Sequence, residues 1–89
     1  MSQIKKLYNK LNRKPTPRDV EFEELDRLLK YFGFDRRQPS RGGSQYIYTH
    51  KELNEFQVTV AKDNPVKPPY VRNAITAINK LIEIRDGND

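Results

Sequence analysis

Two neighbouring segments in which polar and apolar residues alternate limit most strongly what this chain can fold into. They read SQYIYTH (residues 44–50) and EFQVTVA (residues 55–61), and only the segment KELN separates them. Successive side chains of a β-strand point to opposite faces, so this alternation predicts an antiparallel pair of strands with one buried face. In the second strand, the apolar face consists of Phe56, Val58 and Val60.

Two amphipathic helical patterns flank these strands. Residues 22–32 carry apolar side chains on one helical face, and Gly33 suits the position that follows a helix end. Pro68 and Pro69 suit the first turn of a second helix, in which apolar residues recur at helical spacing up to Ile82. Each helix has one face to bury, and both can lie on one face of an antiparallel sheet.

Shorter elements complete the pattern. A basic helix is predicted from Ser2, as its N-cap, to about Arg13, and Pro15 and Pro17 then force an extended connector. A first strand is predicted at residues 34–38, before the turn segment QPSRGGS. The apolar face of the basic helix consists of Ile4, Leu7, Tyr8 and Leu11.

The elements together predict an α+β fold of one domain, residues 1–89. The expected order is helix, three antiparallel strands, helix, with an extra N-terminal helix and with the two long helices on one face of the sheet. The basic helix occupies residues 1–14, the core residues 20–83, and residues 86–89 form a frayed tail. The other face of the sheet is expected to stay open.

Composition excludes several classes of site. The chain has no cysteine and one histidine, so it lacks the ligands for a disulfide or a Cys/His zinc site. No apolar run approaches the roughly 20 residues that span a membrane, and we expect a cytoplasmic protein without metal or cofactor. Seventeen basic and twelve acidic residues give a formal charge of +5, which is compatible with a polyanionic partner.

Three segments resemble the HicA family of bacterial toxins: FEELDRLLKYFGF, RGGSQYIYTH and FQVTVAKDNPVKPPYVRNAI. The resemblance covers residues 20 to 81. It implies a fold like that of double-stranded-RNA-binding domains, α-β-β-β-α, and cleavage of mRNA without a metal. It also implies a partner, a HicB-like antitoxin that covers the active site.

The family's catalytic histidine follows a glycine and a serine at the start of the second strand. In this chain the piece reads Gly43-Ser44-Gln45, and a second family histidine falls on or near Asp63. A glutamine amide forms hydrogen bonds but does not titrate, so it cannot transfer the protons of RNA cleavage. We therefore expect Gln45 to leave the domain inactive or weakened, whether by natural drift or by an introduced change.

The predicted strand that contains Gln45, residues 44–50, also fixes the expected roles of its neighbours. His50 projects to the face opposite Gln45 and lies about 17 Å along the strand, so it is expected to make a local hydrogen bond at the strand end rather than to replace the catalytic histidine. Tyr46 and Tyr48 are expected to point toward the helices. The alternative register places Ile47 in the core.

Basic residues near the open face are expected to contact RNA phosphates. The acidic pair Glu23 and Glu24 is expected to stabilise a helix N-terminus and not to hold a metal. Two functions remain open: a HicA-like mRNA endoribonuclease, and a non-enzymatic module that binds RNA or protein on the same face. The predicted RNA-binding residues are Arg36, Arg37, Arg41, Gly43, Ser44, Lys51, Lys62 and Lys67.

Overall fold

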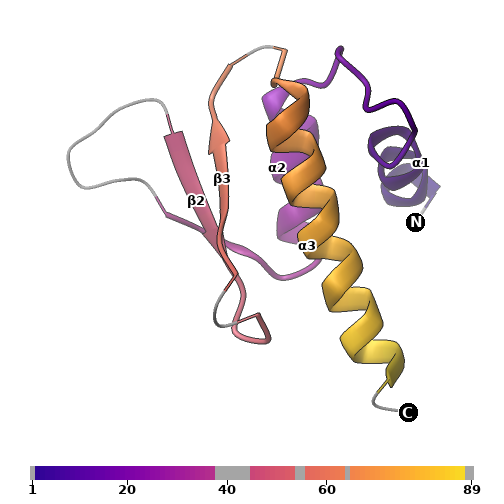
Figure 1. Cartoon of the computed structure of the whole chain (residues 1–89), viewed down its shortest axis with the longest axis vertical. Coiled ribbons are helices and arrows are strands. Elements are labelled where there is room, and N and C mark those ends of the chain that lie inside the picture. The colour runs from indigo at the N-terminus through magenta and orange to yellow at the C-terminus, as the bar shows by residue number, and fades with distance from the viewer. Residues whose placement is uncertain (1, 38–44, 54–55, 64, 88–89) are drawn as a thin grey trace.

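The computed structural model describes residues 2–37, 45–53, 56–63 and 65–87 (Figure 1). It has three helices and three strands in these ranges, in the order α-α-β-β-β-α. This order confirms the predicted α+β fold with an additional N-terminal helix. The elements are α1 (Ser2–Leu11), α2 (Phe22–Tyr31), β1 (Asp35–Arg37), β2 (Gln45–Thr49), β3 (Val58–Ala61) and α3 (Pro68–Gly87).

The three strands form one antiparallel sheet with β2 in the centre. On one side of β2, Arg36 of β1 pairs with Tyr48. On the other side, Tyr48 pairs with Val58 and Tyr46 pairs with Val60 of β3. Since paired residues project to the same face, the two tyrosines and the two valines share one face of the sheet.

Helices α2 and α3 lie on this face of the sheet, and α1 lies on the far side of the helices (Figure 1). None of the described helices lies over the opposite face of the sheet (Figure 1). α2 starts with a capping box, in which Glu21 and Glu24 exchange side-chain and backbone hydrogen bonds. It ends at Tyr31, and Gly33, which follows the C-cap Phe32, has a φ of 93° in the left-handed region that glycine adopts without strain.

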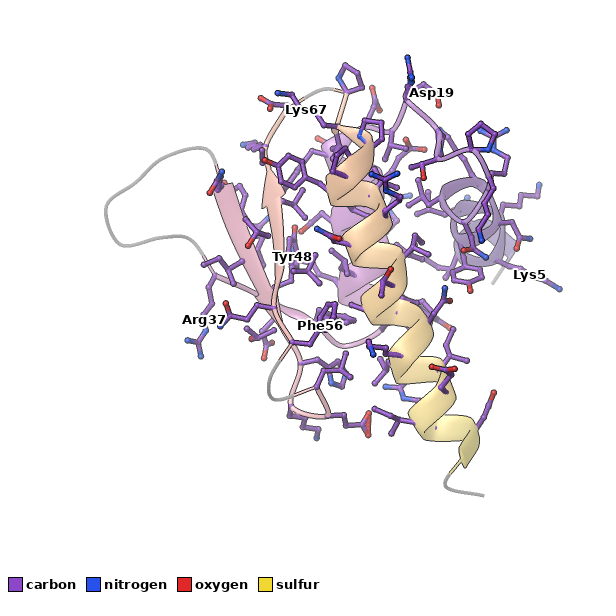
Figure 2. All side chains as sticks on the ribbon, viewed as in Figure 1. Lys5, Asp19, Arg37, Tyr48, Phe56 and Lys67 are labelled. Atoms are coloured by element: carbon purple, nitrogen blue, oxygen red, sulfur yellow. The ribbon has the colours of Figure 1, made fainter. Side chains whose placement is uncertain are left out.

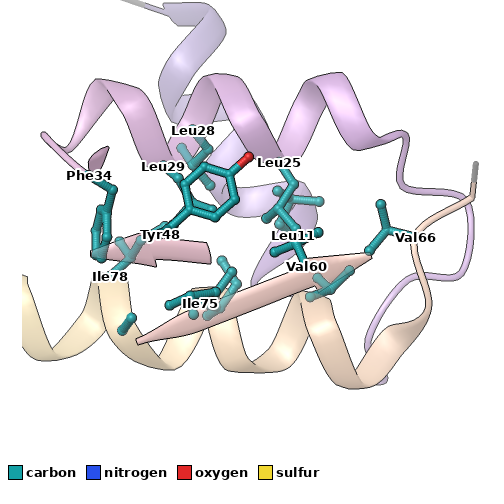
Figure 3. Close-up of a cluster of buried hydrophobic side chains, with 14 of the residues drawn as sticks. Leu11, Leu25, Leu28, Leu29, Phe34, Tyr48, Val60, Val66, Ile75 and Ile78 are labelled. Carbon is teal, nitrogen blue, oxygen red and sulfur yellow. The ribbon is translucent and has the colours of Figure 1, made fainter. Parts of the chain in front are cut away.

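The core lies between the sheet and α2 and α3 (Figure 3). Tyr48 is fully buried and points from β2 toward α2, whereas Ile47 is only half-buried on the other face. The predicted register with the tyrosines inward is therefore confirmed, and the alternative with Ile47 in the core is wrong. The buried cluster labelled in Figure 3 includes, besides Tyr48, Leu25, Leu28, Leu29, Phe34, Val60, Ile75 and Ile78.

Several element bounds differ from those predicted. β3 starts at Val58 because the backbone N–H of Phe56 donates to the carbonyl of Leu53 in a turn, 2.9 Å away, and so does not join the sheet. β1 starts one residue after the buried Phe34, and Gln38 lies outside the described residues. α3 continues to Gly87, which places part of the expected tail, residues 86–87, in the helix.

Candidate functional site

The open face of the sheet is the surface on which the sequence predicts a site. Its middle row consists of Arg37, Ile47 and Thr59, which are paired across the three strands. Gln45 pairs with Ala61 in the next row, toward one end of the sheet. The described helices lie on the other side of the sheet (Figure 1). On this face Gln45 and Arg37 are exposed, Ile47 and Thr59 are half-buried, and Ala61 is buried.

Gln45 is the first residue of β2, and its side chain is exposed. Its pairing partner Ala61 comes two residues before Asp63, which is also exposed, so both predicted family positions lie at one end of the sheet. The backbone N–H of Asp63 donates to the carbonyl of Ala61, 2.9 Å away, which turns the chain directly after β3. The structure thus places Gln45 and Asp63 at the same end of the sheet. The neighbouring predicted residues Arg41, Gly43 and Ser44 lie outside the described residues.

Arg36 lies on the other face of the sheet. Its guanidinium lies 4.9 Å from the centre of the Tyr46 ring, and its Nη1 is 3.3 Å from Oδ1 of Asp26 in α2. This placement follows from the pairing of Arg36 with Tyr48, which directs both side chains toward the helices. Arg36 therefore holds β1 against α2 and is not on the open face.

The remaining predicted cations are exposed but do not form one cluster. Arg37 points away from the helices (Figure 2) and lies near Asp35, two residues earlier on the same face of β1. Lys62 follows β3 and Lys67 precedes α3, near the end of the sheet that carries Gln45. Lys51 follows β2 at the opposite end. Among the described residues, the predicted cations therefore lie at both ends of the sheet and not in one place.

His50 is buried and has partners for both ring nitrogens. Nε2 donates to the carbonyl of Phe32, 3.0 Å away, and Nδ1 accepts from the backbone N–H of Glu52, also at 3.0 Å. The Phe34 ring meets it edge-on at 5.1 Å. The predicted local role of His50 at the strand end is confirmed, because both nitrogens are bound to backbone groups on the helix side of the sheet.

One buried polar link was not predicted. The Tyr48 hydroxyl donates to Oδ1 of Asp26 at 2.6 Å, and the same carboxylate pairs with Lys30 at 3.2 Å and with Arg36. Burial, and then the hydrogen bond and charge of Asp26, raises the pKa of the Tyr48 hydroxyl well above its usual value. The spacing of Asp26 and Lys30 on α2 was visible in the sequence, but the tyrosine partner was not.

Two further features of the described ranges concern metal ligation and membrane-spanning helices. Among the residues that the structure describes, no group of three or more His, Asp or Glu side chains converges on a point where a metal could bind. Glu23 and Glu24 lie in the first turn of α2, as predicted. Within the same ranges, none of the helices combines the length and the apolar composition needed to cross a bilayer.

Comparison of the chain with protein-family models, with curated proteins and with solved structures found no significant match. The HicA resemblance therefore rests on the residue pattern, and the structure supports the small α+β fold that the pattern predicts. Family membership and activity stay predictions.

Proposed function

We propose that this chain is a HicA-like toxin domain that binds mRNA on the open face of its sheet and has lost most of its catalytic power at Gln45. The observation that carries the proposal is the position of Gln45. It is an exposed side chain at the start of the central strand, on the face without helices and at the same end of the sheet as Asp63. A histidine in this position would meet an RNA strand that lies along β2.

The chemistry explains why the substitution matters. Cleavage of RNA without a metal requires a base for the 2′-hydroxyl and an acid for the leaving oxygen, and histidine serves both because it titrates near neutral pH. The amide of Gln45 can hold a phosphate or a base by hydrogen bonds only. His50 does not substitute, because both of its nitrogens are engaged and it lies on the buried face.

A HicB-like antitoxin is the protein partner that this proposal implies. The half-buried Ile47, Thr49 and Thr59 on the open face give a protein a surface that is polar at its edges and partly apolar at its centre. Such a partner would compete with RNA for the face.

A non-enzymatic binding module on the same face is the second candidate. The observation that favours it is the balance of charge on the face, where Arg37 lies near Asp35 and Lys62 precedes Asp63. A face of this kind suits hydrogen bonds to bases and riboses better than attraction of phosphates.

The test is to compare the chain with Gln45→His in a purified RNA cleavage assay that contains EDTA. General acid–base catalysis contributes about a hundredfold to ten-thousandfold, so Gln45→His should cleave at least about a hundred times faster than the Gln45 chain. Gln45→Asn is the matched control and should stay at the lower rate. Equal cleavage by all three proteins, or none by any, would remove the catalytic part of the proposal and leave the binding module.

A further inference from the structure

The positive charge of the chain is concentrated far from the open face. Residues 1–18 contain six of the seventeen basic residues and none of the twelve acidic ones. Residues 19–89 therefore contain eleven basic and twelve acidic residues, a formal charge of −1. The surplus of +5 that favours a polyanionic partner thus belongs to α1 and the connector after it, and not to the sheet.

A cleft lies where this basic segment meets α3. Its volume is about 810 Å³, one wall is formed by residues 11–18, and the other by α3 between Pro68 and Asn79. None of the described residues that line it is acidic. Four cationic side chains line it, all exposed: Arg13, Lys14, Arg18 and Arg72.

These four cations are available to a ligand. Within the described part of the chain, the ion pairs involve Lys10, Lys30, Arg36 and Arg85, and so none of the cleft cations is neutralised by a carboxylate. Amide and hydroxyl groups of Asn12, Thr16 and Thr76 lie among them and can add neutral hydrogen bonds.

The walls of the cleft are fixed before any ligand binds. Leu11 and Ile75 line the cleft and are buried in the core. The Tyr8 hydroxyl of α1 donates to Oδ1 of Asn79 in α3, and Lys10 pairs with Glu24 of α2 at 3.1 Å. Because α1 is attached to both long helices, a ligand does not have to order the cleft, which favours affinity.

The length of the cleft suits a chain of charges rather than a single anion. Pro68 and Asn79 are eleven residues apart on α3, a distance of about 16 Å along the helix at 1.5 Å per residue. Successive phosphates of a nucleic-acid strand follow each other every few ångströms, so several of them fit along this wall.

The side chains that line the cleft favour a nucleic-acid ligand over a protein ligand. Protein interfaces depend on aromatic or large aliphatic anchors in desolvated pockets. The large hydrophobic side chains that are exposed in the described ranges, Tyr31 and Ile84, do not line the cleft, and neither does any aromatic ring. Without a stacking ring among these lining residues, the cleft offers bases no aromatic surface, whereas its four cations suit phosphates.

We propose that the cleft between residues 12–18 and α3 binds the phosphate backbone of an RNA strand without regard to its sequence. The site lies across the helices from the open face (Figure 1), so one molecule has two RNA-contacting surfaces with different tasks. The proposal rests on the proposed function only for the identity of the polyanion as RNA.

The test measures binding of a fluorescent mixed-sequence RNA to the Gln45 chain between about 50 and 200 mM salt. A cleft variant combines Arg13→Gln, Lys14→Gln, Arg18→Gln and Arg72→Gln. A control variant loses the same charge at exposed positions outside the cleft and the open face. Its substitutions are Lys5→Gln, Lys6→Gln, Arg27→Gln and Lys80→Gln.

The cleft variant should bind RNA about a hundredfold or more weakly, and the slope of log affinity against log salt should fall by about three, since each phosphate contact contributes about 0.7 on a single strand. The control variant should lose less than about tenfold. Thermal melts followed by circular dichroism establish that both variants fold. If the cleft variant does not fold, Arg13→Gln and Arg72→Gln singly should each lower the slope by about 0.7.

Three results would overturn the proposal. The first is an equal loss in the control variant, which would mean that only net charge matters. The second is no saturable RNA binding at the lowest salt. The third is binding of poly-L-glutamate as tight as that of RNA, which would indicate an acidic protein segment instead. Cleavage by Gln45→His is measured separately, so failure of the nuclease proposal leaves this result unaffected, and the reverse also holds.

Discussion

The open face of the sheet and the cleft beside α3 differ in charge and in the elements that form them. The open face displays Gln45 and Arg37 on strands whose backbones are fixed by pairing, and its described residues include the acidic Asp35 as well as Arg37. The cleft displays four unpaired cations on a connector and a helix, and none of its described lining residues is acidic. The difference suggests a division of tasks, in which one surface positions a reactive or recognised group and the other supplies affinity.

Long-range attraction of RNA depends on uncompensated cations, whereas discrimination depends on hydrogen bonds made at fixed positions. A domain of 89 residues has little surface on which to combine the two. Separating them by the layer of α2 and α3 also keeps the cations away from Asp35 and Asp63 near the sheet.

The largest expected effects come from two leucines, of which one lines the cleft and one does not. Leu11 and Leu28 are both buried (Figure 3), and replacing either with alanine should lower the free energy of unfolding by about 2–5 kcal/mol. Only Leu11 lines the cleft, so only Leu11→Ala should also weaken RNA binding at a temperature where both variants are folded. Urea denaturation and RNA titration measure the two effects. Equal weakening by Leu28→Ala would show that affinity reports general loosening of the core.

A smaller effect is expected at the link between the sheet and α2. Tyr48→Phe removes a hydrogen bond to a charged acceptor, Asp26, and should cost about 1.5–3 kcal/mol of stability near neutral pH. RNA binding in the cleft should be unchanged, because Tyr48 lies on the sheet side of the helices. Weaker RNA binding by this variant would contradict the separation of the two surfaces.

Tyr48 also predicts how stability depends on pH. Its pKa is raised by burial and then by Asp26, so the folded chain keeps the hydroxyl proton at pH values where the unfolded chain loses it. The contribution is therefore complete below about pH 10 and decreases as the pH rises further, by up to about 1.4 kcal/mol per pH unit. Urea denaturation at several alkaline pH values should give a shallower decrease for Tyr48→Phe than for the original chain.

The next prediction tests whether His50 takes part in RNA cleavage on the open face. His50→Ala leaves the carbonyl of Phe32 and the N–H of Glu52 without their side-chain partner, which should cost about 1–3 kcal/mol. Introduced together with Gln45→His, it should leave the rate of RNA cleavage unchanged at a temperature where the protein is folded. A tenfold or greater loss of cleavage would identify His50 as part of the chemistry and contradict its structural role.

The sequence predicts the features that depend on local periodicity. The apolar stripes of α2 and α3 and the alternation in β2 are strong enough to place the elements and to direct Tyr48 inward. Gly33 was also predictable as a helix end, because a positive φ favours glycine. These features require only the spacing of residues within one element.

Features that depend on two distant segments were not predictable. The side of the sheet to which Arg36 points depends on the register between β1 and β2, which a strand of three residues does not specify. The cleft forms only because residues 12–18 lie beside residues 68–79, fifty or more positions later. The same separation concealed the bond between Tyr8 and Asn79. RNA-binding cations are therefore predicted from the sequence near the glycine turn, and residues 12–18 are not among them.

The smallest expected effect on RNA binding concerns Lys10, which lies close to the cleft but does not line it. Lys10 pairs with Glu24 at 3.1 Å, and the two side chains are 31% and 29% exposed, so the pair should contribute at most about 1 kcal/mol. Glu24 already compensates the charge of Lys10, and Lys10 does not line the cleft. Lys10→Gln should therefore change the salt dependence of RNA binding less than any single cleft substitution. Anisotropy titrations at several salt concentrations would compare it with Arg13→Gln. If Lys10→Gln lowers the slope as much as Arg13→Gln, the whole basic segment attracts RNA as a diffuse charge, and the cleft is not a defined site.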